Sequence, residues 1–196
     1  MAKVQARRLS RREQVSLFAR NFLKHPRMLG SVIPSSRFLV DRLLRRVDWA
    51  RARLIVEYGP GVGNFTAEIL RRMHPDAKLV VIETNEDFVD YLRQSLPDPR
   101  LRVEAGSAAD VVEILERMGL GSADYVISGI PFSTMPAELR VSILRATRAA
   151  LKPDGAFLVY QFSGGVLPDL KRIFGWVQQS FEPLNVLPAR LFYCSP

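Results

Sequence analysis

Two acidic residues and a glycine-rich turn between residues 54 and 83 have the types and spacing of a nucleoside site. An apolar run that begins at Leu54 ends in Glu57, and a helical pattern starts at Asn64. Three glycines stand at alternate positions between them: Gly59, Gly61 and Gly63. Glycines at a strand-to-helix turn let the backbone bend sharply and let a ligand lie close against it. A second acid, Glu83, ends the next apolar run, 20 positions beyond Gly63.

The two carboxylates decide which nucleoside fits. A dinucleotide site has Gly-x-Gly-x-x-Gly, whereas here the third glycine comes one position early and Asn64 takes the last place. A carboxylate at Glu57 attracts a cationic amino group and repels a pyrophosphate. Glu83 lies about where an acid holds ribose hydroxyls in such folds. Together they predict S-adenosylmethionine as cofactor and S-adenosylhomocysteine as product; a plain glycine turn is the structural alternative.

The elements that must position these residues are predicted to alternate along the chain. Strands are indicated at residues 54–58, 78–83, 101–104, 123–128, 155–162, 184–187 and 190–194. Helices are indicated at residues 9–25, 35–46, 64–73, 85–95, 108–118, 136–151 and 167–179. This alternation predicts an α/β, Rossmann-like, doubly wound and mostly parallel seven-stranded sheet. The last two strands have no helix between them, which predicts an antiparallel C-terminal hairpin. Residues 1–46 are predicted to form N-terminal helices, and residues 47–196 the cofactor-binding domain.

The remaining strand ends supply further candidates, because ligands of open α/β sheets lie beyond the carboxyl ends of the strands. The third strand is followed by Ser107 and Ala108, which either flank an adenine ring or form a simple turn. The fifth ends in Tyr160 and Gln161, polar groups that need hydrogen-bond partners if buried. Tyr160 has two possible roles, contact with the substrate and structural anchoring, and the sequence favours neither.

The fourth strand ends in Ser128 and a loop made rigid by Gly129 and Pro131. A carbonyl of Gly129 or Ile130 would accept a hydrogen bond from a substrate amine and orient its lone pair. Phe132 would pack on the substrate nitrogen or its methyl group; the alternative is a core phenylalanine that fills the loop.

The composition of the chain excludes some kinds of site and indicates where its positive charge lies. The single cysteine, Cys194, excludes an internal disulfide, and two histidines leave almost no material for a metal or triad site. Eight basic residues against one acid in residues 1–27 account for +7 of the net charge of +8. The helix at 9–25 combines this charge with an apolar face, which favours an anionic membrane interface over an RNA-binding or merely solvated arm; a lid over the pocket is compatible with membrane contact. No run is long enough to span a membrane, so we expect a cytoplasmic, peripherally membrane-associated protein.

The motifs together resemble the bacterial soluble phospholipid N-methyltransferases, which are class I methyltransferases that convert phosphatidylethanolamine stepwise to phosphatidylcholine. The matching segments are residues 30–36, 57–63, 128–132, 160–163 and 187–190. The resemblance implies that Ser35 and Ser36 line the cofactor. The family often has an acid to hold the adenine amine where this chain has Ser107. The chain is also similar to the ribosomal RNA adenine N6-dimethyltransferases, but residues 128–132 keep only one proline and the aromatic of their motif, and we expect no helical RNA-binding domain.

The sequence therefore predicts an S-adenosylmethionine-dependent N-methyltransferase acting on the phosphatidylethanolamine headgroup at an anionic membrane surface. In this hypothesis Glu57 holds the amino group of the cofactor and Glu83 its ribose, and Ser128 also contacts the cofactor. Gly129, Ile130 and Phe132 place the substrate amine, and Tyr160 contacts the headgroup; no metal takes part. An RNA or small-molecule methyltransferase is the alternative enzyme. A non-catalytic protein that binds membrane or nucleic acid through a methyltransferase scaffold ranks last.

Overall fold

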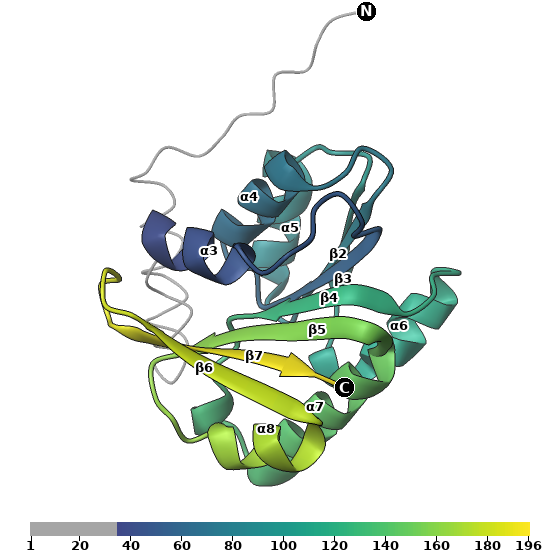
Figure 1. The fold of residues 1–196 in the computed structure, drawn as a ribbon. Coiled ribbons are helices and arrows are strands. Elements are labelled where there is room, and N and C mark those ends of the chain that lie inside the picture. The colour runs from purple at the N-terminus through teal and green to yellow at the C-terminus, as the bar shows by residue number, and fades with distance from the viewer. Residues whose placement is uncertain (1–34) are drawn as a thin grey trace, which may run out of the picture.

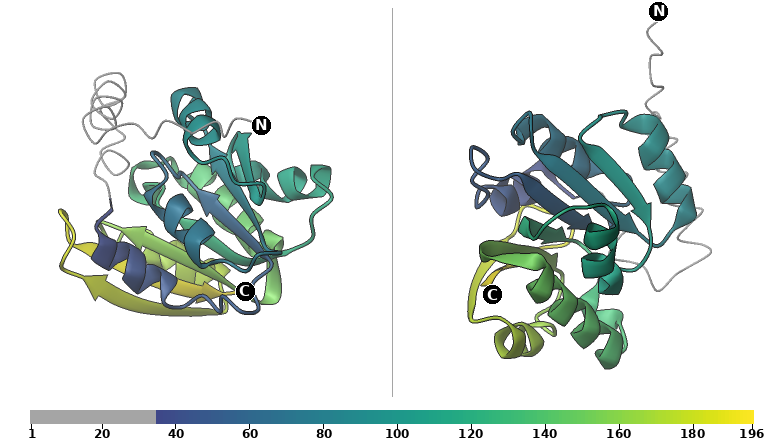
Figure 2. Two further views of the ribbon diagram at one scale, coloured as in Figure 1. Left: turned by 90° about the horizontal axis from the view of Figure 1, so that it is seen from above. Right: turned by 90° about the vertical axis from the view of Figure 1, so that its right-hand side faces the viewer.

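The computed structural model describes residues 35–196, which form one seven-stranded sheet with helices on both faces (Figures 1 and 2). The sheet order is β3-β2-β1-β4-β5-β7-β6. The strands are β1 (Leu54–Tyr58), β2 (Lys78–Glu83), β3 (Leu101–Ala105), β4 (Ala123–Ser128), β5 (Leu151–Gln161), β6 (Trp176–Glu182) and β7 (Ala189–Ser195). The α-helices are α3 (Arg37–Leu44), α4 (Asn64–Arg72), α5 (Glu86–Ser95), α6 (Val111–Arg117), α7 (Ala137–Ala150) and α8 (Leu167–Ile173). The predicted fold class is confirmed.

The first five strands are parallel, and β1 pairs with both β2 and β4. The chain order reverses direction across the sheet at β1 and β4, so the carboxyl ends of these strands form the crevice in which open α/β sheets bind their ligands. Every residue of β1 is buried, as expected for a central strand covered on both faces.

Alternate residues of the strands enter two cores on opposite faces of the sheet. Ile55 and Leu79 pack with α3 and α4, whereas Val56 and Val80 pack with α6, α7 and α8. Glu57 follows the same alternation as Ile55 and therefore points toward α4. This places the first candidate carboxylate on the face that carries the helix after the glycine turn.

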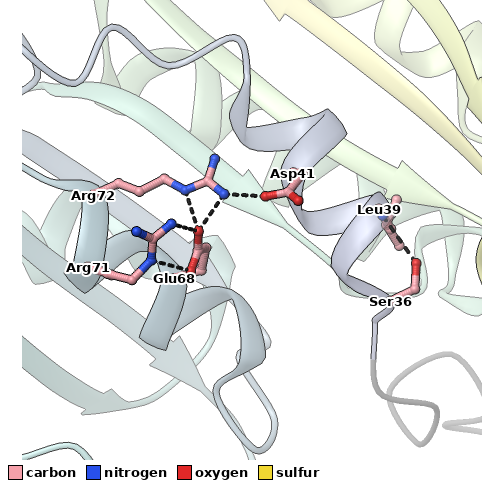
Figure 3. A network of polar contacts seen from close by, with 6 residues as sticks. All are labelled: Ser36, Leu39, Asp41, Glu68, Arg71 and Arg72. Carbon is pink, nitrogen blue, oxygen red and sulfur yellow. Dashed lines mark hydrogen bonds and ion pairs between the residues drawn. The ribbon is translucent and has the colours of Figure 1, made fainter.

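Helix α3 packs against the sheet and against α4. Ser36 caps it by accepting a hydrogen bond from the Leu39 amide at 3.2 Å, and the helix lies within the range 35–46 predicted from the sequence. Arg72 of α4 forms ion pairs with both Asp41 of α3 and Glu68 of its own helix (Figure 3). The predicted helix at residues 9–25 lies outside the described residues.

Two boundaries differ from the prediction at the C-terminal end. The helix expected over residues 167–179 ends at Ile173, and the strand expected at residues 184–187 is a loop, because the first strand of the hairpin is β6 (Trp176–Glu182). Gly175 follows the helix where a Cβ would lie 3.0 Å from the Pro196 carbonyl oxygen. The chain turns at Gly175 beside the last residue, Pro196. Val177 and Phe181, which lie an even number of positions apart, then belong to strand β6.

Strand β5 also begins earlier than the predicted residue 155. It starts at Leu151, opposite Ala123, and the pairing with β4 shifts register between Ala123 and Tyr125. The antiparallel hairpin itself, formed by β6 and β7, is confirmed.

Candidate active site

The candidate site lies at the carboxyl ends of β1, β2 and β4. Glu57 is 3% exposed, and the Thr66 hydroxyl of α4 donates a hydrogen bond to its Oε2 at 2.7 Å. Burial raises the pKa of Glu57 to about 8; the hydrogen bond from Thr66 opposes this rise and the nearby charge of Glu83 adds to it. Thr66 had no predicted role. Its signal in the sequence is a hydroxyl one helical turn beyond Gly63, on the side of α4 that faces the strand end.

The carboxylate of Glu83 is held by two backbone amides, one just after β2 and one in the glycine turn. One of its carboxylate oxygens accepts a hydrogen bond from the Asn85 amide at 3.0 Å, and the other from the Gly61 amide at 3.3 Å. The side chain is 5% exposed, and burial raises its pKa against the lowering effect of these amides. The carboxylate therefore fixes the glycine turn relative to the end of β2.

The glycine turn needs glycine at each of its three positions. Gly59, Gly61 and Gly63 have φ values of +63°, +56° and +80°, in the left-handed region that other residues rarely adopt. A Cβ at Gly59 would lie 2.6 Å from Cγ2 of Ile130, and one at Gly63 would lie 2.7 Å from Cδ2 of Leu92. At these two positions the missing side chain makes room for packing within the protein.

The loop after β4 is held by the protein itself. The Ile130 carbonyl accepts hydrogen bonds from the Phe132 amide at 2.9 Å and from Nε2 of Gln161 at 2.7 Å. Ser128 is buried, and its hydroxyl oxygen lies 3.4 Å from the Ile130 amide, which donates to it. Both acceptor positions of the Ile130 carbonyl are thus in use.

Phe132 lies in the hydrophobic core. It is fully buried, and its ring meets that of Phe157 edge-on with centroids 6.2 Å apart. Of the two predictions for this residue, the structure supports the core phenylalanine that fills the loop. A contact with substrate would require Phe132 to leave the core.

Tyr160 joins α3 to the loop after β4. Its hydroxyl accepts a hydrogen bond from Oγ of Ser35 at 3.2 Å, and its ring stacks on Phe65 with centroids 5.3 Å apart. A Cβ at Gly129 would lie only 2.4 Å from the Tyr160 hydroxyl oxygen. Burial raises the pKa of Tyr160, so the hydroxyl keeps its proton. Ser35, Gly129 and Tyr160 therefore meet at one point beside Glu57.

Two other predicted cofactor ligands use their hydroxyl groups within the protein. Ser36 donates to the Leu184 carbonyl at 2.7 Å in addition to capping α3. Ser107 caps the short 3-10 turn Ala108–Asp110 by accepting from the Ala109 amide at 3.1 Å. Ala108 is buried at the start of that turn. Contacts of these residues with a cofactor stay predictions.

Residues 55–155 match the family model described as a methyltransferase domain. The chain belongs to this family. S-adenosylmethionine is therefore its methyl donor, as the acids and the glycine turn predicted.

This methyltransferase is 34% identical over 180 residues to the ornithine lipid N-methyltransferase of Singulisphaera acidiphila, a match that covers 91% of this chain and 94% of the relative. It is 31% identical over 114 residues to ribosomal RNA small subunit methyltransferase A of Mycoplasma mycoides subsp. mycoides, which covers 56% of this chain and 41% of the relative. The structure of precorrin-6y C5,15-methyltransferase from Geobacter metallireducens superposes with a TM-score of 0.66 at 14% identity, covering 83% of this chain and 89% of that one. This last likeness concerns the fold.

The acids of the methyltransferase fit the cofactor. Both carboxylates are buried, and within residues 35–196 neither forms an ion pair with a lysine or arginine. Among these residues Thr66 alone donates a hydrogen bond to the carboxylate of Glu57. Buried acids without a cationic partner are costly unless a ligand supplies one. The amino group of S-adenosylmethionine carries such a charge.

The described part of the methyltransferase contains no cluster of three histidine, cysteine or acidic residues that could hold a metal ion. Between residues 35 and 196 no helix has the length and apolar character needed to cross a membrane.

Proposed function

We propose that this methyltransferase transfers methyl groups to the primary amine of a membrane-lipid headgroup, and that an ornithine lipid is its preferred substrate. The supporting observation is the relative from Singulisphaera acidiphila, an ornithine lipid N-methyltransferase that matches this chain over 91% of its length. Phosphatidylethanolamine, the substrate expected from the sequence, also presents a primary amine beside an anionic group. The ribosomal RNA relative corresponds to little more than half of the chain.

The residues at the site have distinct roles in this proposal. Glu57 holds the amino group of S-adenosylmethionine, and Glu83, fixed by the Gly61 and Asn85 amides, holds the ribose. When bound, this cofactor supplies an electrophilic methyl group and is converted to S-adenosylhomocysteine. Counted from its ammonium form, the substrate releases one proton to bulk water for each methyl group it gains. The protein contributes by positioning the amine and excluding water.

The substrate amine is placed where Ser35, Gly129 and Tyr160 meet. Tyr160 keeps its proton and Ser35 donates to its oxygen, so a lone pair of this oxygen is free to accept from an amine N–H. A buried site disfavours the ammonium form and leaves the nitrogen lone pair available for attack. Tyr160 thus orients the nucleophile without taking its proton.

Methyl transfer from radiolabelled cofactor tests the proposal in three parallel reactions. The acceptors are ornithine lipid in anionic vesicles, phosphatidylethanolamine in the same vesicles, and unmodified small-subunit ribosomal RNA. We expect labelled lipid, with more label on the ornithine lipid. Tyr160→Phe should lower kcat by about tenfold while the affinity for S-adenosylhomocysteine stays constant.

Glu83→Ala is the control for this assay, because it should weaken binding of S-adenosylhomocysteine and remove activity on every acceptor together. Label on RNA alone, from protein that binds the cofactor, would contradict the lipid assignment. More label on phosphatidylethanolamine than on ornithine lipid would keep the lipid class and correct the headgroup.

A further inference from the structure

The loop between β6 and β7 exposes apolar side chains beside the candidate site. Leu184, Val186 and Leu187 are 60%, 71% and 42% exposed. Gln161, the last residue of β5, pairs with Arg190 of the antiparallel β7, so the loop extends past the carboxyl edge of the sheet. Figure 1 shows it as the yellow tip of the hairpin, projecting beyond the strands on the side of the first turn of α3.

We propose that this loop, residues 183–188, docks the methyltransferase on the surface of an anionic lipid bilayer and so brings headgroups to the site. The proposal rests on the proposed function for the identity of the substrate, but the docking itself is a separate property. The sequence assigned membrane contact to the N-terminal basic helix, and for the loop it predicted a strand at residues 184–187.

Part of the backbone of the loop is hydrogen bonded within the protein. Leu184 donates its amide to Glu182 at 2.8 Å and its carbonyl accepts from Ser36 at 2.7 Å. The carbonyl of Leu187 accepts from Nδ2 of Asn185 at 2.9 Å. The loop begins and ends with prolines, residues 183 and 188, which have no amide hydrogen. Because unpaired backbone groups make irregular chain costly in lipid, these hydrogen bonds lower the cost of bringing the loop to the interface.

The loop is also connected to the site through α3. The Ser36 amide donates to Oδ1 of Asn185 at 2.8 Å, and the neighbouring residue, Ser35, donates to the hydroxyl of Tyr160. Asn185 is buried, whereas the apolar residues on either side of it are exposed. The polar side chain therefore anchors the loop to α3, and the apolar side chains point away from the protein beside the mouth of the site.

The charges around the loop select an anionic surface. Arg190 follows the loop, and Arg37, in the first turn of α3, places its guanidinium 4.9 Å from the centroid of the exposed Phe38 ring. No acidic residue lies between positions 183 and 196. The acid nearest in sequence, Glu182, is buried and paired with Arg42 at 3.1 Å. Exposed apolar residues flanked by arginines are typical of surfaces that lie in the interface of anionic membranes.

Co-sedimentation of the full chain with vesicles tests the docking. The vesicles contain equal amounts of phosphatidylglycerol and phosphatidylcholine, so they present no primary amine and report binding without catalysis. The double variant Leu184→Ser/Leu187→Ser should bind about tenfold more weakly than the unmodified protein, because two apolar side chains no longer enter the interface.

Trp176→Ser is the matched control. Trp176 is 53% exposed on β6 of the same hairpin, but it pairs with Ser195 at the opposite end, away from the site. We expect this variant to bind vesicles as the unmodified protein does. Unchanged binding of the double variant, or an equal loss in Trp176→Ser, would overturn the proposal. A dimer in solution that the double variant converts to monomer would do the same, because the occupant of the loop would then be a second copy.

Activity on dispersed substrate separates docking from chemistry. With a short-chain amine lipid below its micelle concentration, the double variant should methylate at the rate of the unmodified protein, but it should methylate lipid in vesicles more slowly. A lower rate on both the dispersed and the vesicle substrate would overturn the docking role, because the loop would then affect the site itself. Vesicle binding without methylation of any lipid would contradict the proposed function and leave the docking surface intact.

Discussion

At the scale of single residues, the two buried carboxyl groups of the free site are unfavourable in their ionised form, and a cationic ligand would stabilise that form. Glu57 and Glu83 are both buried, and the charge of Glu83 helps to raise the pKa of Glu57. Glu83 is compensated by backbone amides, whereas Glu57 has one hydroxyl donor, Thr66. Glu57 is thus the group whose protonation state depends most on whether the cofactor is present.

The substitution Glu57→Gln should stabilise the free protein and weaken the cofactor complex. The pKa of Glu57 is about 8 against an ordinary 4.5, so the unfolded chain releases its proton first as the pH rises. The free energy of unfolding of the unmodified protein should therefore fall between about pH 4.5 and pH 8 through this group. We expect the variant to lose this dependence and to be more stable at pH 8 by on the order of 2 kcal/mol in denaturant titrations.

Calorimetry with S-adenosylhomocysteine measures the other half of this prediction. The unmodified protein should release a proton on binding below pH 8, because the cationic amino group favours the ionised carboxylate. Glu57→Gln should release less and bind at least about tenfold more weakly. Equal affinity and equal proton release in both proteins would show that Glu57 does not hold the amino group.

At the scale of elements, α3 links the cofactor edge of the sheet to the hairpin loop. Its buried residues, Leu39 and Leu43, pack with α4, and Arg72 of α4 holds Asp41 on its outer side (Figure 3). The residues just before the helix supply both Ser35 for Tyr160 and Ser36 for Leu184. The position of α3 therefore sets two contacts at once.

Arg72→Ala should loosen this helix, and Arg71→Ala should not. Arg72 is mostly covered and forms ion pairs with both α3 and α4, whereas the exposed Arg71 forms an ion pair with Glu68 of its own helix and, among the described residues, none with α3. We expect denaturant titration to show a loss of about 1 kcal/mol for Arg72→Ala and no measurable change for Arg71→Ala. Similar losses in the two variants would mean that the bridge to Asp41 does not hold α3.

At the scale of the whole molecule, positive charge and exposed apolar surface are separated along the chain. Residues 1–27 hold +7 of the net charge, whereas the apolar loop lies near the C-terminal end. Electrostatic attraction to a membrane is screened by salt, but burial of apolar side chains is not. Each segment should therefore leave its own signature in the binding curve.

Deletion of residues 1–24 should remove most of the salt-sensitive part of vesicle binding. We expect the affinity of the full chain for phosphatidylglycerol vesicles to fall steeply as salt is raised, and that of the truncated chain, which keeps Arg37 and Arg190, to be low and to fall much less. The double variant in the loop should keep the steep dependence at a lower affinity. A truncated chain with unchanged affinity and salt response would show that the basic segment does not contact the membrane.

The sequence by itself determined the sheet, its order of elements and the strand ends that carry the acids. Hydrophobic periodicity and the glycine turn are local signals, and the carboxyl ends of neighbouring parallel strands always lie at the same edge of a sheet. Glu57 and Glu83 can therefore be identified from their spacing in the sequence.

Only the tertiary structure decided which hydrogen-bond partners and packing neighbours the side chains near those strand ends have. Phe132 fills the core and Gln161 holds the Ile130 carbonyl. Their partners are distant in sequence, and packing between distant segments, unlike periodicity, leaves no regular spacing to read. The same reason explains β6, whose start at Trp176 depends on its pairing with β7 and on the crowding of Gly175 by the C-terminus.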